Sequence, residues 1–309
     1  MSYAPLGGDE CWRVVAQEVA DDSTSFEAGA EDPSPRSATT TPCGPESKLV
    51  SQMPRECAFC SQPANSKEHV WPDWLRRTED IRAALPHVLA EQRGAGAPEV
   101  VRQYEDQPYK MKTGYVCKTC NHGWMSDLEQ DVEQIMGGML AGRGRELGSG
   151  SQAALAAWAF KMAVVFDRVW DADAWVVPSE HAHALREHGE PPYGTRLWMA
   201  SYDTTSVGIS RMFACSTALE GQDYDSDSRN VYVRTFTVGP TLFQIYGTTN
   251  PGLTELDTKW PLHHEVHQLW PYAGTFTWRP RPAMTDEIVA AFADRIFVGL
   301  STISAQVDP

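Results

Sequence analysis

Four cysteines in two closely spaced pairs are the residues whose types and spacing point most directly to chemistry. The pairs are Cys57-x-x-Cys60 and Cys117-x-x-Cys120. In each pair the two thiolates converge on one side of a tight turn, and two such turns supply the four tetrahedral ligands that Zn²⁺ prefers. Cys60 and Cys117 lie 57 positions apart (117 minus 60), which is longer than the usual spacing in a zinc ribbon. We predict one shared structural Zn²⁺ site, with unrelated cysteines as the alternative.

The elements that must position these cysteines are short. The sequence predicts a helix over residues 74–89, a loop over residues 94–98, and strands over residues 100–104 and 111–116. After Asn121, apolar residues recur at spacings of three and four, which indicates a helix. Ser126 and Glu129 fit a capping box that would start this helix at Ser126. A start near Asn121 is the alternative.

The remainder of the chain reads as helices followed by strands. Residues 152–170 carry a wide apolar stripe at helical spacing, and residues 179–188 predict a shorter helix that Gly189 ends. A last helix is predicted over residues 285–297, with Thr285 as its N-cap. The strand pattern covers residues 196–202, 206–215, 230–238, 241–246, 267–270 and 275–278, with a hairpin turn at Gly239-Pro240. We therefore predict an α+β fold with antiparallel strands.

Composition narrows the class of protein. The chain has 309 residues and a net charge of −15, and residues 1–50 are rich in Ser, Thr, Pro, Gly and acids, which predicts a disordered acidic tail. Residues 51–125 carry ten Lys/Arg and nine Asp/Glu, and they are the one part of the chain without a net negative charge. Because even this part is nearly neutral, we expect no strong basic surface for nonspecific nucleic-acid binding. The sequence contains no run of about 18 apolar residues, so no membrane span is predicted. The first residues do not resemble a signal peptide, and we expect a cytoplasmic protein.

The order of the motifs resembles the four-cysteine branch of the HNH (ββα-metal) endonucleases. That branch reads C-x2-C, then an acid and a His followed by an aliphatic residue and a Pro, then C-x2-C followed by Asn or His. Here the pairs enclose Glu68-His69-Val70-Trp71-Pro72, and Asn121 follows the second pair. The resemblance covers residues 55–130, less than a third of the chain. It implies a zinc-stabilised ββα-metal module at residues 51–141, followed by an accessory α+β domain at residues 151–309.

The roles of individual residues follow from this resemblance. It implies a metal-dependent endonuclease that hydrolyses phosphodiester bonds, with DNA as the foremost substrate. Glu68 and Asn121 would hold a catalytic Mg²⁺ or Mn²⁺, with His122 as the rival of Asn121, and His69 would be the general base. Oxygen ligands suit a hard cation, and imidazole suits proton transfer at neutral pH. Just beyond the motif, Arg76 and Arg77 are the candidate nucleic-acid contacts, on phosphate.

One departure from the family pattern supports a different class of function. The family usually has an Asn several residues before the second cysteine pair, where it braces the catalytic loop. This chain has Lys112-Thr113-Gly114 there, and Thr113 is the candidate substitute. The alternative prediction is a noncatalytic zinc-binding module that recognises nucleic acid or a protein partner, which the missing Asn and the acidic charge favour. A further alternative keeps the nuclease and changes its substrate to RNA or another phosphodiester.

Overall fold

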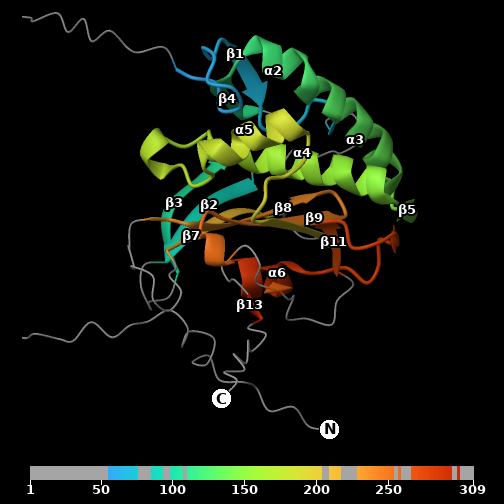
Figure 1. Cartoon of the computed structure of the whole chain (residues 1–309). Coiled ribbons are helices and arrows are strands. Elements are labelled where there is room, and N and C mark those ends of the chain that lie inside the picture. The colour runs from blue at the N-terminus through green and yellow to red at the C-terminus, as the bar shows by residue number, and fades with distance from the viewer. Residues whose placement is uncertain are drawn as a thin grey trace, which may run out of the picture.

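The protein consists of a large sheet, a central helix above it, and a small hairpin with its own helices above that helix (Figure 1). The computed structural model describes residues 55–75, 85–92, 98–106, 110–203, 209–216, 228–253, 257–258, 266–293 and 298–299. The acidic tail predicted at residues 1–50 lies outside these ranges, as do Arg76 and Arg77. Among the described residues, no helix combines the length and the apolar character that a membrane crossing requires.

The main sheet has seven strands. They are β2 (Leu85–Gln92), β3 (Glu99–Asp106), β6 (Thr195–Ser201), β7 (Ser210–Cys215), β8 (Val231–Val238), β9 (Thr241–Thr248) and β11 (Val266–Trp270). Their spatial order is β11-β6-β9-β8-β7-β2-β3. Neighbouring strands pair antiparallel except β2 and β7, which pair parallel. The sheet is therefore mixed, and it draws two strands from the segment between the cysteine pairs.

The hairpin of β8 and β9 confirms the turn predicted at Gly239-Pro240, where Gly239 has a positive φ of 50°. Further along the same pair of strands, Tyr232 lies opposite Gly247. A Cβ at Gly247 would lie 2.1 Å from the Cζ of Tyr232, so only glycine lets the aromatic ring cross the neighbouring backbone.

Helix α4 (Ser149–Asp167) forms the centre of the protein, and every residue from Leu155 to Asp167 is buried. A helix that is apolar on all sides must be covered on all sides. On the sheet side, the ring of Trp158 lies 6.2 Å from that of Phe236 and 5.6 Å from that of Phe243. On the other side lies α3 (Trp124–Leu140), and α5 (Ser179–His188) runs alongside (Figure 1). This burial confirms the strong helical pattern of residues 152–170.

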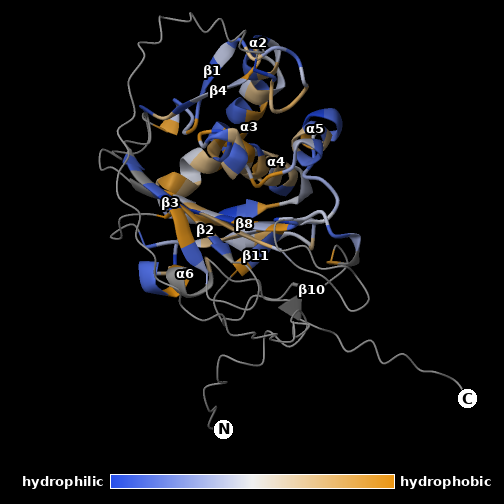
Figure 2. Ribbon diagram, turned by 90° about the vertical axis from the view of Figure 1, so that its left-hand side faces the viewer, coloured by the Kyte–Doolittle hydropathy of each residue, from blue (hydrophilic) through white to orange (hydrophobic). Residues whose placement is uncertain are grey.

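The opposite face of the sheet carries α6 (Asp286–Ala293), whose Val289 packs with Tyr202, Leu242 and Met284. In Figure 2, hydrophobic residues colour β2 and β3 within the sheet, whereas α5 carries many hydrophilic residues. The smaller elements are the pair β5 (Arg145–Leu147) and β12 (Phe276–Trp278), the pair β10 (Asp257–Thr258) and β13 (Val298–Gly299), and the 3₁₀ helices η3 (Ala172–Ala174) and η4 (Pro251–Leu253).

Two local predictions are wrong. The helix predicted over residues 74–89 does not include its last five residues, which lie in β2 because Leu85–Gln92 pairs with β3 and β7. The capping box is also absent. Helix α3 begins at Trp124, two residues before Ser126, and its N-cap residue, Gly123, makes no side-chain cap. The side chain of Glu129 instead bonds to a lysine of α4, which is described below.

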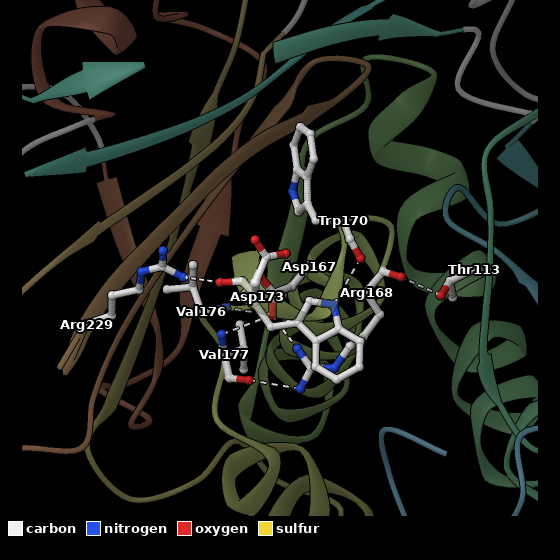
Figure 3. Close-up of polar contacts among 9 residues, drawn as sticks. Thr113, Asp167, Arg168, Trp170, Asp173, Val176, Val177 and Arg229 are labelled. Atoms are coloured by element: carbon white, nitrogen blue, oxygen red, sulfur yellow. Dashed lines mark hydrogen bonds and ion pairs between the residues drawn. The ribbon is translucent and has the colours of Figure 1, made fainter. Parts of the chain in front are cut away.

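A buried ion pair fixes the end of α4 (Figure 3). The carboxylate of Asp167 accepts a hydrogen bond from the guanidinium of Arg168 and further bonds from the backbone amides of Val176 and Val177, at 3.0 Å each. Arg168 Nη2 donates to the carbonyl of Val177 at 2.9 Å. Both side chains are almost fully buried, so these bonds satisfy charges that water does not reach. The segment after α4 is thereby tied back to the helix.

We expect Asp167→Ala to lower the free energy of unfolding by about 3–5 kcal/mol, because it leaves the charge of Arg168 buried without its partner. Urea denaturation measures this loss. The matched control is Asp173→Ala, which removes a carboxylate that is 73% exposed and pairs with Arg102 on the surface. That change should cost less than about 1 kcal/mol. Equal losses for the two variants would contradict the assigned role of the buried pair.

Candidate zinc centre and the adjoining hairpin

The four cysteines predicted to share a metal come together in the structure. The sulfur atoms of Cys57, Cys60, Cys117 and Cys120 all lie within 4.8 Å of one another. Cys60 Sγ lies 3.6 Å from the sulfurs of both Cys117 and Cys120. A tetrahedral Zn²⁺ with bonds of about 2.3 Å separates its sulfurs by about 3.8 Å, whereas a disulfide needs about 2.05 Å. The cluster therefore fits a zinc ion and not a pair of disulfides.

Each cysteine pair is shaped by local hydrogen bonds. In the first pair, the amides of Cys60 and Ser61 donate to the carbonyl of Cys57 at 3.3 and 3.1 Å, and Ser61 adopts a positive φ of 53°. In the second pair, Cys117 is the N-cap of α2 (Lys118–His122), and its sulfur accepts a bond from the Cys120 amide at 3.4 Å. Both turns direct their sulfurs inward, which is why a C-x2-C spacing predicts the site.

Burial and hydrogen bonding shift the pKa values of the thiols in opposite directions. Burial raises the pKa of Cys57 and raises that of Cys120 to about 11. Burial opposes ionisation of Cys117 as well, but hydrogen bonds from the Cys120 amide and the neighbouring thiols lower its pKa below the ordinary value. A divalent ion deprotonates the thiols that coordinate it, and the resulting bonds replace the lost hydration. The cluster thus has the chemistry of a structural Zn²⁺ site.

Helix α5 lies over this cluster. Its Arg186 has a raised pKa because the guanidinium bonds to the side chain of Cys120 and lies near the charges of the other thiols. On the same helix, the ring nitrogen Nε2 of His183 lies 3.4 Å from Ser61 Oγ, just after the first pair. A Zn²⁺ held by four thiolates would carry a net charge of −2, which the guanidinium would partly offset.

Between the two cysteine pairs lies a two-stranded sheet, which we call the β1–β4 hairpin although the chain between its strands also forms β2 and β3 of the main sheet. β1 (Ser66–His69) pairs antiparallel with β4 (Lys112–Val116), so that Glu68 lies opposite Thr113 and His69 lies opposite Lys112. The register shifts between Ser66 and Glu68. The helices α2 and α3 follow β4 directly. The strands and helices around the cysteines are therefore part of a mixed α+β fold.

The predicted ligands lie on the facing elements β1 and α2. Asn121 is half-buried, and its Nδ2 donates to Ser66 Oγ at 2.8 Å and to the carbonyl of Lys67 at 3.5 Å. Its amide oxygen is the atom left for other partners. His69 is half-buried at the end of β1, and His122 is exposed on α2. Arg76 and Arg77 lie outside the described residues.

Glu68 has a partner that the sequence does not reveal. Its carboxylate is 7% exposed, and its Oε1 accepts a hydrogen bond from the Nζ of Lys161 at 2.8 Å. Lys161 also donates to Glu129 Oε1 at 2.5 Å. The available signal is a single lysine inside the apolar helix of residues 152–170, to which the helical pattern assigns no partner. The capping-box pattern assigns Glu129 to a backbone amide and so hides its real partner.

Thr113 takes up a different role from the one predicted. Its buried hydroxyl donates to the backbone carbonyl of Arg168 at 2.8 Å (Figure 3), and it accepts a weaker bond from the Tyr115 amide at 3.4 Å. The hydroxyl therefore ties the hairpin to the end of α4. Neither of these two bonds joins Thr113 to the loop after His69, which is the brace that the family resemblance implied.

Glu68 and Asn121 have the donor chemistry of a hard-cation site, because both offer oxygen and β1 and α2 are in contact. Across the described ranges, however, the four cysteines are the one group of three or more His, Cys, Asp or Glu side chains close enough to share an ion. A divalent ion held by Glu68 and Asn121 would therefore complete its coordination with water and with oxygens of a bound substrate.

No protein-family model, curated protein or solved structure matches this chain. The mixed α+β fold and the four-cysteine cluster are the two properties that the structure establishes.

Replacing one thiol tests the zinc site directly. We expect Cys117→Ser to lose the bound zinc and to lower the unfolding temperature by roughly 10 °C, because three ligands hold the ion weakly and the two cysteine turns lose their common anchor. Zinc content by atomic emission and thermal unfolding measure these effects. Cys215→Ala is the matched control, since Cys215 is a buried thiol of β7 outside the cluster. Equal zinc contents in the two variants would rule out the assignment.

Proposed function

We propose that this protein is a metal-dependent endonuclease that hydrolyses phosphodiester bonds, with DNA as its foremost substrate and an HNH-like module as its catalytic part. One observation carries the proposal. His69 lies at the end of β1, and Asn121 of α2 donates a hydrogen bond to Ser66 of the same strand, next to the four-cysteine cluster. The nearness of these two residues supports the proposal.

In the proposed reaction, ion binding and proton transfer are assigned to different residues. A phosphodiester resists attack because it is anionic and its alkoxide leaving group is poor. A divalent ion such as Mg²⁺ or Mn²⁺, when bound, would supply the Lewis acidity that offsets both. Glu68 and Asn121 would hold that ion, with exposed His122 as the rival of Asn121. His69 would take the proton from the attacking water, which its partial exposure allows. The products would carry a 5′ phosphate and a 3′ hydroxyl.

The zinc would take no part in this chemistry. Four thiolates fill its coordination sphere, which is the property of a structural site, whereas catalytic zinc keeps one position open. Its contribution would be to hold the two strands and α2 at fixed relative positions, so that His69 and Asn121 meet the substrate without a costly rearrangement. Arg76 and Arg77, which follow the motif in sequence, remain the proposed phosphate contacts.

Cleavage of supercoiled plasmid DNA tests this function. We expect the zinc-loaded wild type to nick or linearise the plasmid when Mg²⁺ or Mn²⁺ is added, and to leave it intact when the ion is omitted or chelated. His69→Ala should slow cleavage by about 100-fold or more, because it removes the general base. The matched control is His188→Ala, which removes an exposed histidine at the end of α5, outside the proposed site, and should retain most of the activity.

The result against this proposal is equally clear. If His69→Ala cleaves as fast as the wild type while both hold zinc, the catalytic assignment fails. Comparing duplex DNA, single-stranded DNA and RNA in the same assay would identify the substrate class.

A second candidate function is a noncatalytic zinc module that binds nucleic acid or a protein partner. The pairing of Glu68 with Lys161 favours it, since one carboxylate oxygen of the proposed ligand is already engaged. This candidate predicts binding without cleavage and no effect of His69→Ala on that binding. Electrophoretic mobility shifts with labelled DNA and RNA measure it.

A further inference from the structure

Positive and negative charge are separated along the chain next to the proposed active site. Residues 110–122, which include β4 and α2, contain three lysines and no Asp or Glu. Helix α3 follows at once and carries the reverse, four Asp or Glu and no Lys or Arg. In a protein with a net charge of −15, this separation favours the approach of a polyanion along β4 and away from α3.

Lys112 lies beside the proposed general base. It is directly opposite His69 in the antiparallel pairing of β4 with β1. Residues directly opposite each other in such a pair share one face, with Cβ atoms about 4.5–5.5 Å apart. Lys112 is exposed, and none of the ion pairs among the described residues includes it. The ammonium at the end of its flexible four-carbon side chain can therefore reach a phosphate that lies next to His69.

A second exposed cation lies further along β4. The guanidinium of Arg55 lies over the ring of Tyr115, with its Cζ 5.0 Å from the ring centroid. A Cβ at Gly114 would lie 3.1 Å from Arg55 Nη1, so the guanidinium also lies against the strand, two residues beyond Lys112. Two residues of a strand span about 7 Å. A guanidinium can give a phosphate two parallel N–H bonds, so this position suits a second phosphate contact.

We propose that Lys112 and Arg55 form a phosphate-binding track along β4, on which the backbone of a DNA strand lies so that one phosphate reaches His69. Lys112 binds the phosphate that adjoins the cleaved one, and Arg55 binds a phosphate further along the same strand. This inference rests on the proposed function, because His69 fixes which part of the track is next to the reaction. Phosphate contacts carry no sequence information, so the track binds DNA with little dependence on base sequence.

The test is binding of a short fluorescein-labelled DNA duplex to the full-length, zinc-loaded protein, measured by fluorescence anisotropy at several salt concentrations. No Mg²⁺ or Mn²⁺ is added, which prevents cleavage during the measurement. Lys112→Gln should weaken binding about fivefold at roughly 0.1 M salt. It should also reduce the slope of log K against log [salt] by about 0.9, as loss of one phosphate contact requires. Combining it with Arg55→Gln should reduce the slope by about twice as much.

Two further variants separate charge on the track from charge in general. Arg143→Gln removes an exposed cation beyond the far end of α3 and should leave both the affinity and the salt slope unchanged. Lys112→Arg keeps the charge and should retain the slope of the wild type. The inference is overturned if Lys112→Gln binds with the affinity and slope of the wild type, if Arg143→Gln weakens binding equally, or if the wild type binds no DNA.

The failure of this inference can be told apart from failure of the proposed function. DNA binding that depends on Lys112, in a protein that cleaves no nucleic acid when Mg²⁺ or Mn²⁺ is added, would support the track and count against the nuclease. Cleavage that depends on His69, with DNA affinity and salt slope indifferent to Lys112, would support the nuclease and overturn the track.

Discussion

The burial of α4 on every side is the constraint on which the rest of the structure depends. Because this helix is covered by the sheet below and by α3 and the hairpin above, a charged or amide side chain on it costs stability unless it bonds inside the protein. Gln152 bonds to backbone carbonyls at Leu147 and Gly274, Lys161 bonds to two carboxylates, and Asp167 bonds to the segment after the helix. The polar residues of α4 therefore connect the helix to separate parts of the chain.

The hairpin that carries His69 is held at two places, by the cysteine cluster at one and by an ion pair at the other. At one end, the cysteine cluster joins the turn before β1 to the turn after β4, and a metal ion would make that junction rigid. At the other, Lys161 holds Glu68, the neighbour of His69, from within the core. The neighbour of His69 is thus fixed by a residue that lies 92 positions beyond His69 in the chain (161 minus 69).

Features set by local sequence can be predicted, whereas features set by distant partners cannot. The cysteine turns, the helix α4 and the turn at Gly239-Pro240 depend on neighbours a few residues away, and their patterns identify them. Strand β2 escapes prediction because its short apolar run becomes a strand only by pairing with β3 and β7, where His87 meets Ser210. The capping box misplaces Glu129 because a capping bond is worth about 1 kcal/mol, while a hydrogen bond to a charged group is worth about 1.5–3 kcal/mol. The Glu129 side chain therefore lies against Lys161, where it makes the stronger bond.

The burial of Lys161 separates the two candidate functions of this pair of strands. A module that only bound a phosphate backbone would gain from positive charge at its contact surface, but the ammonium of Lys161 is fully buried against Glu68 and Glu129 and does not reach that surface. In the proposed nuclease a bound divalent ion would instead supply the positive charge between protein and phosphate. The two candidate functions therefore require different sources of positive charge at β1: a bound ion for the nuclease, and exposed side chains of the protein for the binding module.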